Sequence, residues 1–571
     1  MAEDNTLTDD EMELIDNLEN EMTRDEKEDF YKIWQERCVW LSNRIGQVIN
    51  HLMLNEAHSD ENLLEAINHY AKKKGKITAP AKNLRWLPEK EQLLIWKFDA
   101  EKDEDVFQRK LYKMLLFKAI HDGIKSGMLS FSYSYRFRFV EDYLIPKEEW
   151  EASKEQLLTD AEMSDLSDFT TLLEGMESNL DQLYHQVNDN YNLDLNPHLS
   201  FDKNGKPIIH TPEVEKFDIS RIDAYFKPTR FIPIHDLLSD VEKIAPFLHH
   251  LGHQSKTHEK KRPSSETFFA SIIALGCNIG VEKMRNISKG IQVSSLQHTA
   301  DWYLSEQALE DANNAIIKIK NELALPELHR KSPDELHTAS DGQKVLSQKK
   351  SLNATFSYKY PGYTKAAVVN TAIDERFAIF SSAVITASER EAISMIDLLL
   401  GNPVVKSTIH STDTHGSTEV IFGIMQLLGI YFAPRIKDVG SLLLYGFKNR
   451  KEYEALNYQI VPDHYINKKL IEDHWDDILR VVVSLKLGRT SAQQLLKRLN
   501  SYAQQNPLHK ALKEFGKITR SAFLLRYYDD LELRHSIEKI LAHIELMNRF
   551  GKAIFFGSNQ MFQSDRRCGS H

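Results

Sequence analysis

The stretch Val404–Gly429, "VVKSTIHSTDTHGSTEVIFGIMQLLG", decides the fold because its hydrophobic pattern changes halfway along. Its first part is a β-rich run that ends in a polar segment at Asp413, and its second part is a strongly apolar helical run. An acidic residue therefore lies where a strand gives way to a helix. A rigid sheet can direct acidic side chains at one point from such places, so Asp413 is a candidate functional residue.

Short β-rich runs upstream place this stretch in a sheet. Turn signals such as Pro361-Gly362 separate them, and a helical run at 389–401 follows them. The β-rich runs cover residues 337–346, 352–360, 366–374 and 378–387. Three of these runs, as meandering strands, are followed by a helix, a strand and a helix. This order is typical of a ribonuclease H-like α/β domain with a mixed sheet.

Outside these runs the hydrophobic periodicity is helical, so the predicted fold class is mostly α with one α/β domain. We predict a helical region with an acidic N-terminal segment, a linker with a small hairpin at Asn204-Gly205, a second helical region, and the α/β domain with a helical insertion. The predicted limits are 1–195, 196–232, 233–332 and 333–571, with the insertion at about 440–540. A chain of 571 residues is too long for one hydrophobic core, which agrees with several domains.

The net charge of −11 is concentrated at the N-terminus. Residues 1–30 hold thirteen of the 83 acidic residues and only two of the 72 basic ones, Arg24 and Lys27, so the rest of the chain balances at 70 of each sign. The acidic excess therefore predicts a solvated segment and leaves nucleic-acid binding open for the remainder.

Cysteine usage and hydropathy indicate a cytoplasmic protein that does not enter the membrane. Cys38, Cys277 and Cys568 are far apart and form no metal-ligand spacing, which suits a reducing compartment. The apolar stretches are shorter than the ~20 residues of a membrane-spanning helix, and the first residues lack the pattern of a signal peptide.

A second aspartate, Asp341, lies in the first strand run, within "TASDGQKV". In a ribonuclease H-like sheet the first and fourth strands are neighbours, so Asp341 and Asp413 could converge. Carboxylates of this kind suit Mg²⁺. Structural alternatives remain open for both residues, since Asp341-Gly342 could be an ordinary turn and Asp413 could cap the following helix.

A third acid on a later helix usually completes such a site, and Glu545 is the best candidate. It lies at the edge of the apolar stripe of its helix, beside Leu541. Glu538 and Glu532 are competitors, and a plain surface glutamate is the simpler explanation. Motifs of other enzyme classes, such as a Walker loop or a nucleophile elbow, are missing from the sequence.

Four segments resemble the transposases of the Tn-three family of replicative bacterial transposons. They are "SGMLSFSYSYRFRFVEDYLIPKEEW" at 126–150, "SDGQK" at 340–344, "TDTHGSTEVIFGIMQLLGIYFAPRIKD" at 412–438 and "NPLHKALKEFGKITRSAFLLRYYDDLELR" at 506–534. The likeness extends from about residue 100 to 560, and its most specific part is the 412–438 motif.

The resemblance implies an Asp-Asp-Glu site, in which Asp341, Asp413 and Glu545 are catalytic and bind two Mg²⁺ ions, with Mn²⁺ able to substitute. The intervals of 72 and 132 residues fit the family's helical insertion before the glutamate. The family usually has an Asn-Lys-Gly-Glu-like turn there, whereas this chain reads "LAHIEL". Basic residues near the motifs are candidate DNA phosphate contacts, or else solvated surface charges: Lys344, Arg435, Lys437, Lys486 and Arg489.

The resemblance also implies the reaction and the partners. We expect DNA strand cleavage and strand transfer in replicative transposition, with double-stranded DNA (transposon ends and target) as partner and a homodimer as the assembly. Family members extend beyond this chain at both ends, which predicts a truncated or defective copy. The alternative is a non-catalytic fragment that binds DNA or acts as a poison subunit. An unrelated metal-dependent nuclease would explain the acids but not the 412–438 motif.

Overall fold

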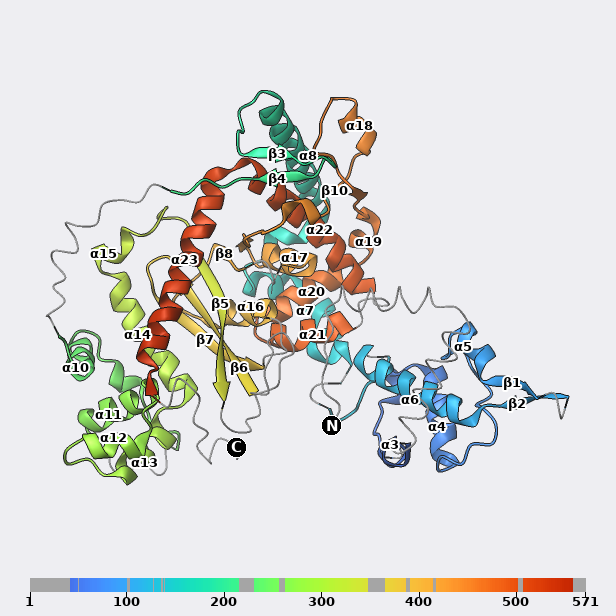
Figure 1. Cartoon of the computed structure of the whole chain (residues 1–571), viewed down its shortest axis with the longest axis horizontal. Coiled ribbons are helices and arrows are strands. Elements are labelled where there is room, and N and C mark those ends of the chain that lie inside the picture. Colours follow the sequence, from blue (N-terminus) through green and yellow to red (C-terminus); the bar gives the residue numbers. More distant parts are fainter. Residues whose placement is uncertain are drawn as a thin grey trace. The chain divides into compact units, whose positions relative to one another are not determined.

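The chain forms two compact units, each discontinuous in sequence (Figure 1). One unit comprises residues 1–164 and 476–510, and the other comprises 165–475 and 511–571. This computed structural model describes residues 42–49, 51–99, 103–126, 128–134, 137, 139–214, 231–255, 262–347, 365–386, 391–413, 417–501 and 507–557. The predicted acidic N-terminal segment and the β-rich run at 352–360 lie outside the described residues. The domain limits predicted from the sequence, at residues 195, 232 and 332, stay a prediction.

The first unit is mostly helical. Its N-terminal part contains α3 (Ser42–Ile49), α4 (Glu61–Lys72), α5 (Glu89–Leu94), the antiparallel strands β1 (Trp96–Asp99) and β2 (Glu104–Phe107), α6 (Arg109–Ser126), the 3-10 helix η2 (Val140–Tyr143) and α7 (Lys147–Asp160). Apolar residues of α4 and α6 form its core, with Leu63, Tyr112 and Leu116 almost fully buried.

Residues 476–510 belong to this unit because buried polar groups bind them to its N-terminal part. Most of α20 (Trp475–Lys486) and all of α21 (Ala492–Ser501) lie in this segment. Arg480 is only 1% exposed; it donates to the carbonyl of Ile145 at 3.2 Å and pairs with the carboxylate of Glu141. The amide of Ile145 in turn donates to Ser484 Oγ at 2.9 Å. A buried arginine that lost these partners would carry an uncompensated charge, so the contacts fix the segment.

The second unit begins with helices and one hairpin. Asn204-Gly205 turns the hairpin between β3 and β4, where the sequence predicted one, and Gly205 has a positive φ of 76°. The elements are α8 (Phe169–Asn192), β3 (Leu199–Phe201), β4 (Pro207–Ile209), α10 (Ile234–Ile244), α11 (Ser265–Gly276), α12 (Val281–Ile287), α13 (Val293–Tyr303), α14 (Glu306–Asn321) and α15 (Ala324–Glu327). None of the described helices is long and apolar enough to cross a membrane.

A mixed five-stranded sheet forms the centre of the second unit. Its order is β7-β6-β5-β8-β9, in which β5, β6 and β7 are antiparallel neighbours and β8 and β9 run parallel to β5. Helix α16 follows β7, and α17 follows β8. The elements are β5 (His337–Ser347), β6 (Lys365–Asp374), β7 (Ile379–Thr386), α16 (Glu391–Gly401), β8 (Ile409–Ser411), α17 (Glu419–Leu427) and β9 (Tyr431–Phe432). The chain is thus mostly helical with one mixed sheet.

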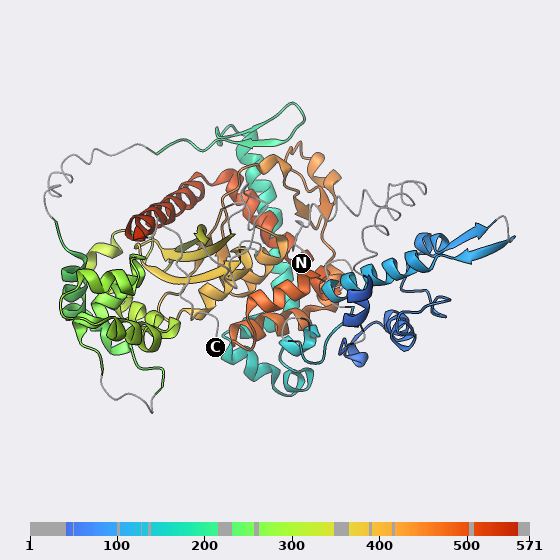
Figure 2. The ribbon, with the colours of Figure 1, turned by 60° about the horizontal axis from the view of Figure 1, so that its bottom comes forward.

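Two helices cover opposite faces of this sheet. Helix α23 (Leu531–Ile554) packs along β5, as the red helix lying over the yellow strands in Figure 2 shows, and α16 packs against β6 and β7. Side chains alternate between the two faces along β5. Asp341 therefore faces α23, whereas Gly342 faces α16. A Cβ atom at Gly342 would lie 2.3 Å from the Glu391 carboxyl carbon, so a larger residue here would require the Glu391 side chain of α16 to move.

Further helices follow the sheet. Gly516 on α22 lies so close to α17 that an added Cβ would be 1.7 Å from the carbonyl oxygen of Glu419. Arg534, 1% exposed, joins α22 to α23 by donating to the carbonyls of Tyr527 and Tyr528. The elements are β10 (Tyr445–Gly446), α18 (Arg450–Glu454), β11 (His464–Tyr465), α19 (Lys468–Asp473), α22 (Pro507–Asp529) and α23.

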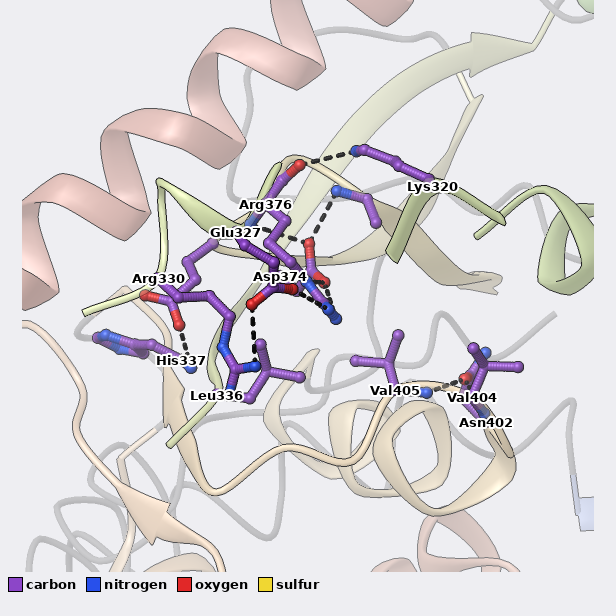
Figure 3. A network of polar contacts seen from close by, with 12 residues as sticks. Lys320, Glu327, Arg330, Leu336, His337, Asp374, Arg376, Asn402, Val404 and Val405 are labelled. Atoms are coloured by element: carbon purple, nitrogen blue, oxygen red, sulfur yellow. Dashed lines mark hydrogen bonds and ion pairs between the residues drawn. The ribbon is translucent and has the colours of Figure 1, made fainter. Parts of the chain in front are cut away.

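A buried ionic network anchors the β6–β7 turn to helices α14 and α15 (Figure 3). Asp374 is fully buried and pairs with Arg376 at 2.7 Å, and Arg376 also pairs with Glu327 at 3.1 Å. Lys320 donates to the carbonyl of Arg376 at 2.7 Å. The sheet is therefore held at this end by charged groups that satisfy one another.

Candidate active site

The two candidate aspartates lie on neighbouring strands, and neither has the structural role that the sequence left open. Asp341 is inside β5, opposite Thr371 of β6, so it is not part of a turn. Asp413 follows β8 by two residues, and Thr418 caps α17 by accepting from the amide of Ile421. Asp413 is therefore not the cap of that helix.

The strand register brings the two aspartates to the same level. In the parallel ladder between β5 and β8, Ala339 pairs with Ser411. Two residues further along the chain are Asp341, still within β5, and Asp413, just past the end of β8. Because side chains alternate with a period of two, both aspartates belong to the same face as the last pair of the ladder. That face is the one covered by α23.

Helix α23 carries Glu545 over this face and is tied directly to β5. Asn548, one turn after Glu545, donates from Nδ2 to Asp341 Oδ2 at 2.8 Å. Gln343, two residues after Asp341, donates to the carbonyl of Asn548 at 3.1 Å. These two hydrogen bonds fix the helix of the third acid on the strand of the first.

The three carboxylates influence one another electrostatically. Burial raises the pKa of Asp341 above its ordinary value, and the negative charges of Asp413 and Glu545 raise this pKa further. Hydrogen bonds from Asn548 and from the amide of Gly342 oppose the rise. Glu545 on α23 is thus close enough for its charge to raise the pKa of Asp341.

The two glutamates that compete with Glu545 for the role of third acid have other neighbours. Glu532 at the start of α23 lies 3.6 Å from Lys331. Glu538 acts on Tyr527 and Arg534 at the junction of α22 and α23. Of the three glutamates considered from the sequence, Glu545 is therefore the best placed for a site with the aspartates.

Two basic side chains hold Asp413. Arg435 Nη2 lies 3.1 Å from Asp413 Oδ1, and Lys437 Nζ lies 3.2 Å from Oδ2. The backbone supports this arrangement, because the amide of Arg435 donates to the carbonyl of Thr412 at 2.9 Å. Glu545 has a looser contact, 3.9 Å from Arg549. The segment "APRIKD" thus supplies the counter-charges of the second acid.

The other candidate phosphate contacts are elsewhere. Lys344 is on β5 and, by strand alternation, on the face opposite Asp341. Lys486 ends α20 and Arg489 follows it; Arg489 donates to the carboxylate of Glu149 at 2.9 Å within the first unit. Of these five residues, Arg435 and Lys437 contact a candidate acid.

The donor set fits a hard divalent cation, because it consists of carboxylate oxygens with a net negative charge. The carboxylates are close enough for their charges to raise the pKa of Asp341. In the part of the chain that the structure describes, no three His, Cys, Asp or Glu side chains are gathered closely enough to hold a metal ion. The chemistry of the residues fits the metal, and Asp413 is engaged with its two cations.

The sequence analysis missed three residues that support the aspartates. Asn548 binds Asp341 directly. His410 and His337 are buried between β5 and β8 and bind hydroxyl groups across the two strands. Nothing in the sequence indicated the partners of these residues.

Comparison with known proteins identifies the family. The model described as the Tn3 transposase DDE domain matches residues 236–571, which is more than half of the chain. The chain therefore belongs to the Tn3-family transposases, as the resemblance had indicated.

Curated relatives are similar over most of this chain. The transposase for transposon Tn1546 of Enterococcus faecium is 28% identical over 553 residues, covering 94% of this chain and 53% of that protein. The transposase for transposon gamma-delta of Escherichia coli K12 is 24% identical over 564 residues, covering 96% and 54%. The transposase for transposon Tn501 of Pseudomonas aeruginosa is 28% identical over 454 residues, covering 78% and 45%. The chain spans about half the length of the curated relatives it matches.

Proposed function

We propose that the α/β part of the second unit is a ribonuclease H-like domain that cleaves DNA strands and transfers them to target DNA in replicative transposition. Membership in the Tn3-family transposases supports this proposal, as does the sheet order β7-β6-β5-β8-β9. The observation that carries it is the aligned register of Asp341 and Asp413 under the helix of Glu545.

The three carboxylates are the proposed ligands of two Mg²⁺ ions, for which Mn²⁺ can substitute. When bound, these ions supply activation of the attacking oxygen and neutralisation of the phosphate charge. The residues of the chain prepare the site for a cation: partial burial and mutual repulsion make the negative charge of Asp341 costly in the absence of a positive partner. Asn548 holds that carboxylate in one orientation.

Basic residues are the proposed contacts of the DNA phosphates. Arg435 and Lys437 already lie beside Asp413, where a scissile phosphate would be cleaved, and their charges suit phosphate oxygens. Lys344, Lys486 and Arg489 stay proposals for contacts further along the DNA. The partners would be double-stranded DNA of the transposon ends and the target, with a homodimer as the assembly, located in the cytoplasm with the DNA.

A nicking assay tests the proposal. The chain is incubated with a labelled duplex that carries transposon-end sequence, with Mg²⁺ or Mn²⁺, and strand breaks and joined products are separated by size. We expect cleavage by the unaltered chain and its loss in Asp413→Ala. Asp236→Ala, which removes an acid whose side chain is 62% exposed on α10, is the matched control and should cleave normally. Equal cleavage by Asp413→Ala and the unaltered chain would refute the assignment.

The second candidate is a non-catalytic fragment that binds DNA or acts as a poison subunit of a longer transposase. It is favoured by the engagement of Asp413 with Arg435 and Lys437, since these contacts compete with a metal ion for the same carboxylate. Calorimetric titration with Mn²⁺ distinguishes the two. Metal uptake that Asp341→Ala removes supports the enzyme, whereas DNA binding without metal uptake supports the fragment.

A further inference from the structure

The strands that carry the two aspartates share a very short ladder. Strand β8 pairs with β5 only over Ile409–Ser411 against His337–Ala339. Backbone pairing between β5 and β8 therefore ends two residues before each aspartate, while β5 stays paired with β6 through Asp341. Beyond the β5–β8 ladder, side-chain contacts between these two strands hold Asp341 and Asp413 relative to one another.

His410 supplies such contacts on the face of α16. Its ring is fully buried, and both ring nitrogens bind hydroxyl groups of β5. Nδ1 lies 2.8 Å from Thr338 Oγ1, and Nε2 lies 3.0 Å from Ser340 Oγ. One imidazole thus spans two successive residues of the same face of β5, and the second of them directly precedes Asp341.

The hydroxyl groups around the ring can satisfy both of its nitrogens. Thr338 Oγ1 lies 2.6 Å from Ser407 Oγ and 3.2 Å from the carbonyl of Ile409, so a neutral ring is satisfied with its proton on either nitrogen. In one arrangement Nδ1–H donates to Thr338 and Ser340 donates to Nε2; in the other Thr338 donates to Nδ1 and Nε2–H donates to Ser340.

His337 makes the matching contact on the face of α23. Ser411 Oγ donates to the carbonyl of Ala433 at 2.7 Å, so it accepts from His337 Nε2–H at 2.8 Å. His337 is only 7% exposed. The two strands are therefore joined by one neutral histidine on each face of the sheet.

We propose that His410 is a positioning residue, which fixes the register of β5 against β8 and thereby the separation of Asp341 from Asp413. This inference rests on the proposed catalytic role of the two aspartates. Without the ring, Ser340 loses this partner, and only three residue pairs of the β5–β8 ladder oppose a shift of β8 along β5. Burial also lowers the pKa of His410 to about 3, so the ring stays neutral under the conditions of a cleavage assay.

The variant His410→Phe tests the proposal because it keeps an aromatic ring and removes both hydrogen bonds. We expect kcat for nicking to fall about 100-fold, as for other small misplacements of reacting groups, with the Kd for DNA unchanged within about twofold. Phe268→Leu, which perturbs the separate core formed by α11, α14 and their neighbours, is the control for general destabilisation and should keep its kcat. Normal kcat in His410→Phe would overturn the inference.

A double-mutant cycle separates positioning from general stability. If His410 acts through Ser340, then Ser340→Ala lowers kcat, and the double variant loses no more than His410→Phe alone. Independent, multiplying losses would contradict this. Selective ¹⁵N labelling of histidine provides a readout that does not need activity: the signals of His410 should show a neutral ring with both nitrogens in hydrogen bonds, and a charged ring would contradict the network.

The same experiments distinguish failure of this inference from failure of the proposed function. If the unaltered chain does not nick DNA, the proposed function fails while the ¹⁵N measurement still tests the network. If the unaltered chain nicks DNA and Asp413→Ala does not, but His410→Phe does, only the positioning role is refuted.

Discussion

The buried histidines between β5 and β8 make the stability of the second unit depend on pH. Burial lowers the pKa of His337 to about 4 and that of His410 to about 3, from an ordinary value of 6.5. Because both values are lower in the folded chain, the unfolded chain binds protons first as the pH falls. The contribution of each neutral ring is therefore complete above about pH 6.5 and declines from there toward the folded pKa.

The size of this effect follows from the distance between the assay pH and the unfolded pKa. A pH of about 5 lies ~1.5 pH units below the pKa of an unfolded histidine, which corresponds to a loss of about 2 kcal/mol of stability for each ring. Two rings give about 4 kcal/mol between about pH 8 and pH 5. That is a large fraction of the stability of an ordinary domain.

Urea unfolding at the two pH values, followed by circular dichroism, measures the effect. The unaltered chain and His410→Phe are compared, because all other titrating groups are common to both and cancel. The variant should be less stable at about pH 8 but should lose about 2 kcal/mol less than the unaltered chain on going to about pH 5. An identical pH dependence in both proteins would refute the reasoning that His410 is neutral in the folded chain.

Four further substitutions test other parts of the structure. Gly516→Ala should lower the unfolding free energy by about 3 kcal/mol in urea titrations, because its Cβ would overlap the carbonyl of Glu419. Asp374→Asn should cost about 3 kcal/mol in the same assay, since it removes the buried one of the two carboxylates that pair with the buried Arg376. Asn548→Ala should cost only about 1 kcal/mol but should lower nicking, because the first aspartate loses its amide donor. Lys437→Gln should weaken DNA binding in filter assays and reduce its salt dependence, if this lysine contacts phosphate.

The sheet could be predicted from the sequence because strand alternation and turn signals are local. The predicted runs at 337–346, 366–374 and 378–387 correspond closely to β5, β6 and β7. The strand that ends at Asp413 was predicted to cover residues 404–413, but β8 covers only Ile409–Ser411. Asn402 explains the difference, since its side chain accepts from the amides of Val404 and Val405 (Figure 3) and holds this segment in a loop.

The aspartates of the candidate site could be proposed because each lies on a strand or directly after one. Their supporting residues could not. Asn548 is 207 positions from Asp341, and His410 is 70 from Ser340, and amide or hydroxyl partners at such separations have no characteristic spacing. The assignment of 476–510 to the first unit was likewise invisible, because it depends on the buried partners of Arg480.

The discontinuous first unit has a consequence for the order in which the protein can fold during synthesis. Its N-terminal part, up to Ser164, must wait for the segment that begins at Asp476, about 310 residues later. At ~5–20 residues per second, the ribosome needs roughly 15 to 60 s to deliver that segment. Until then the surfaces around Ile145 that bind Arg480 and Ser484 have no partner. The nascent chain is therefore exposed to chaperones and proteases for most of its synthesis, and its second unit is nearly complete before its first can close.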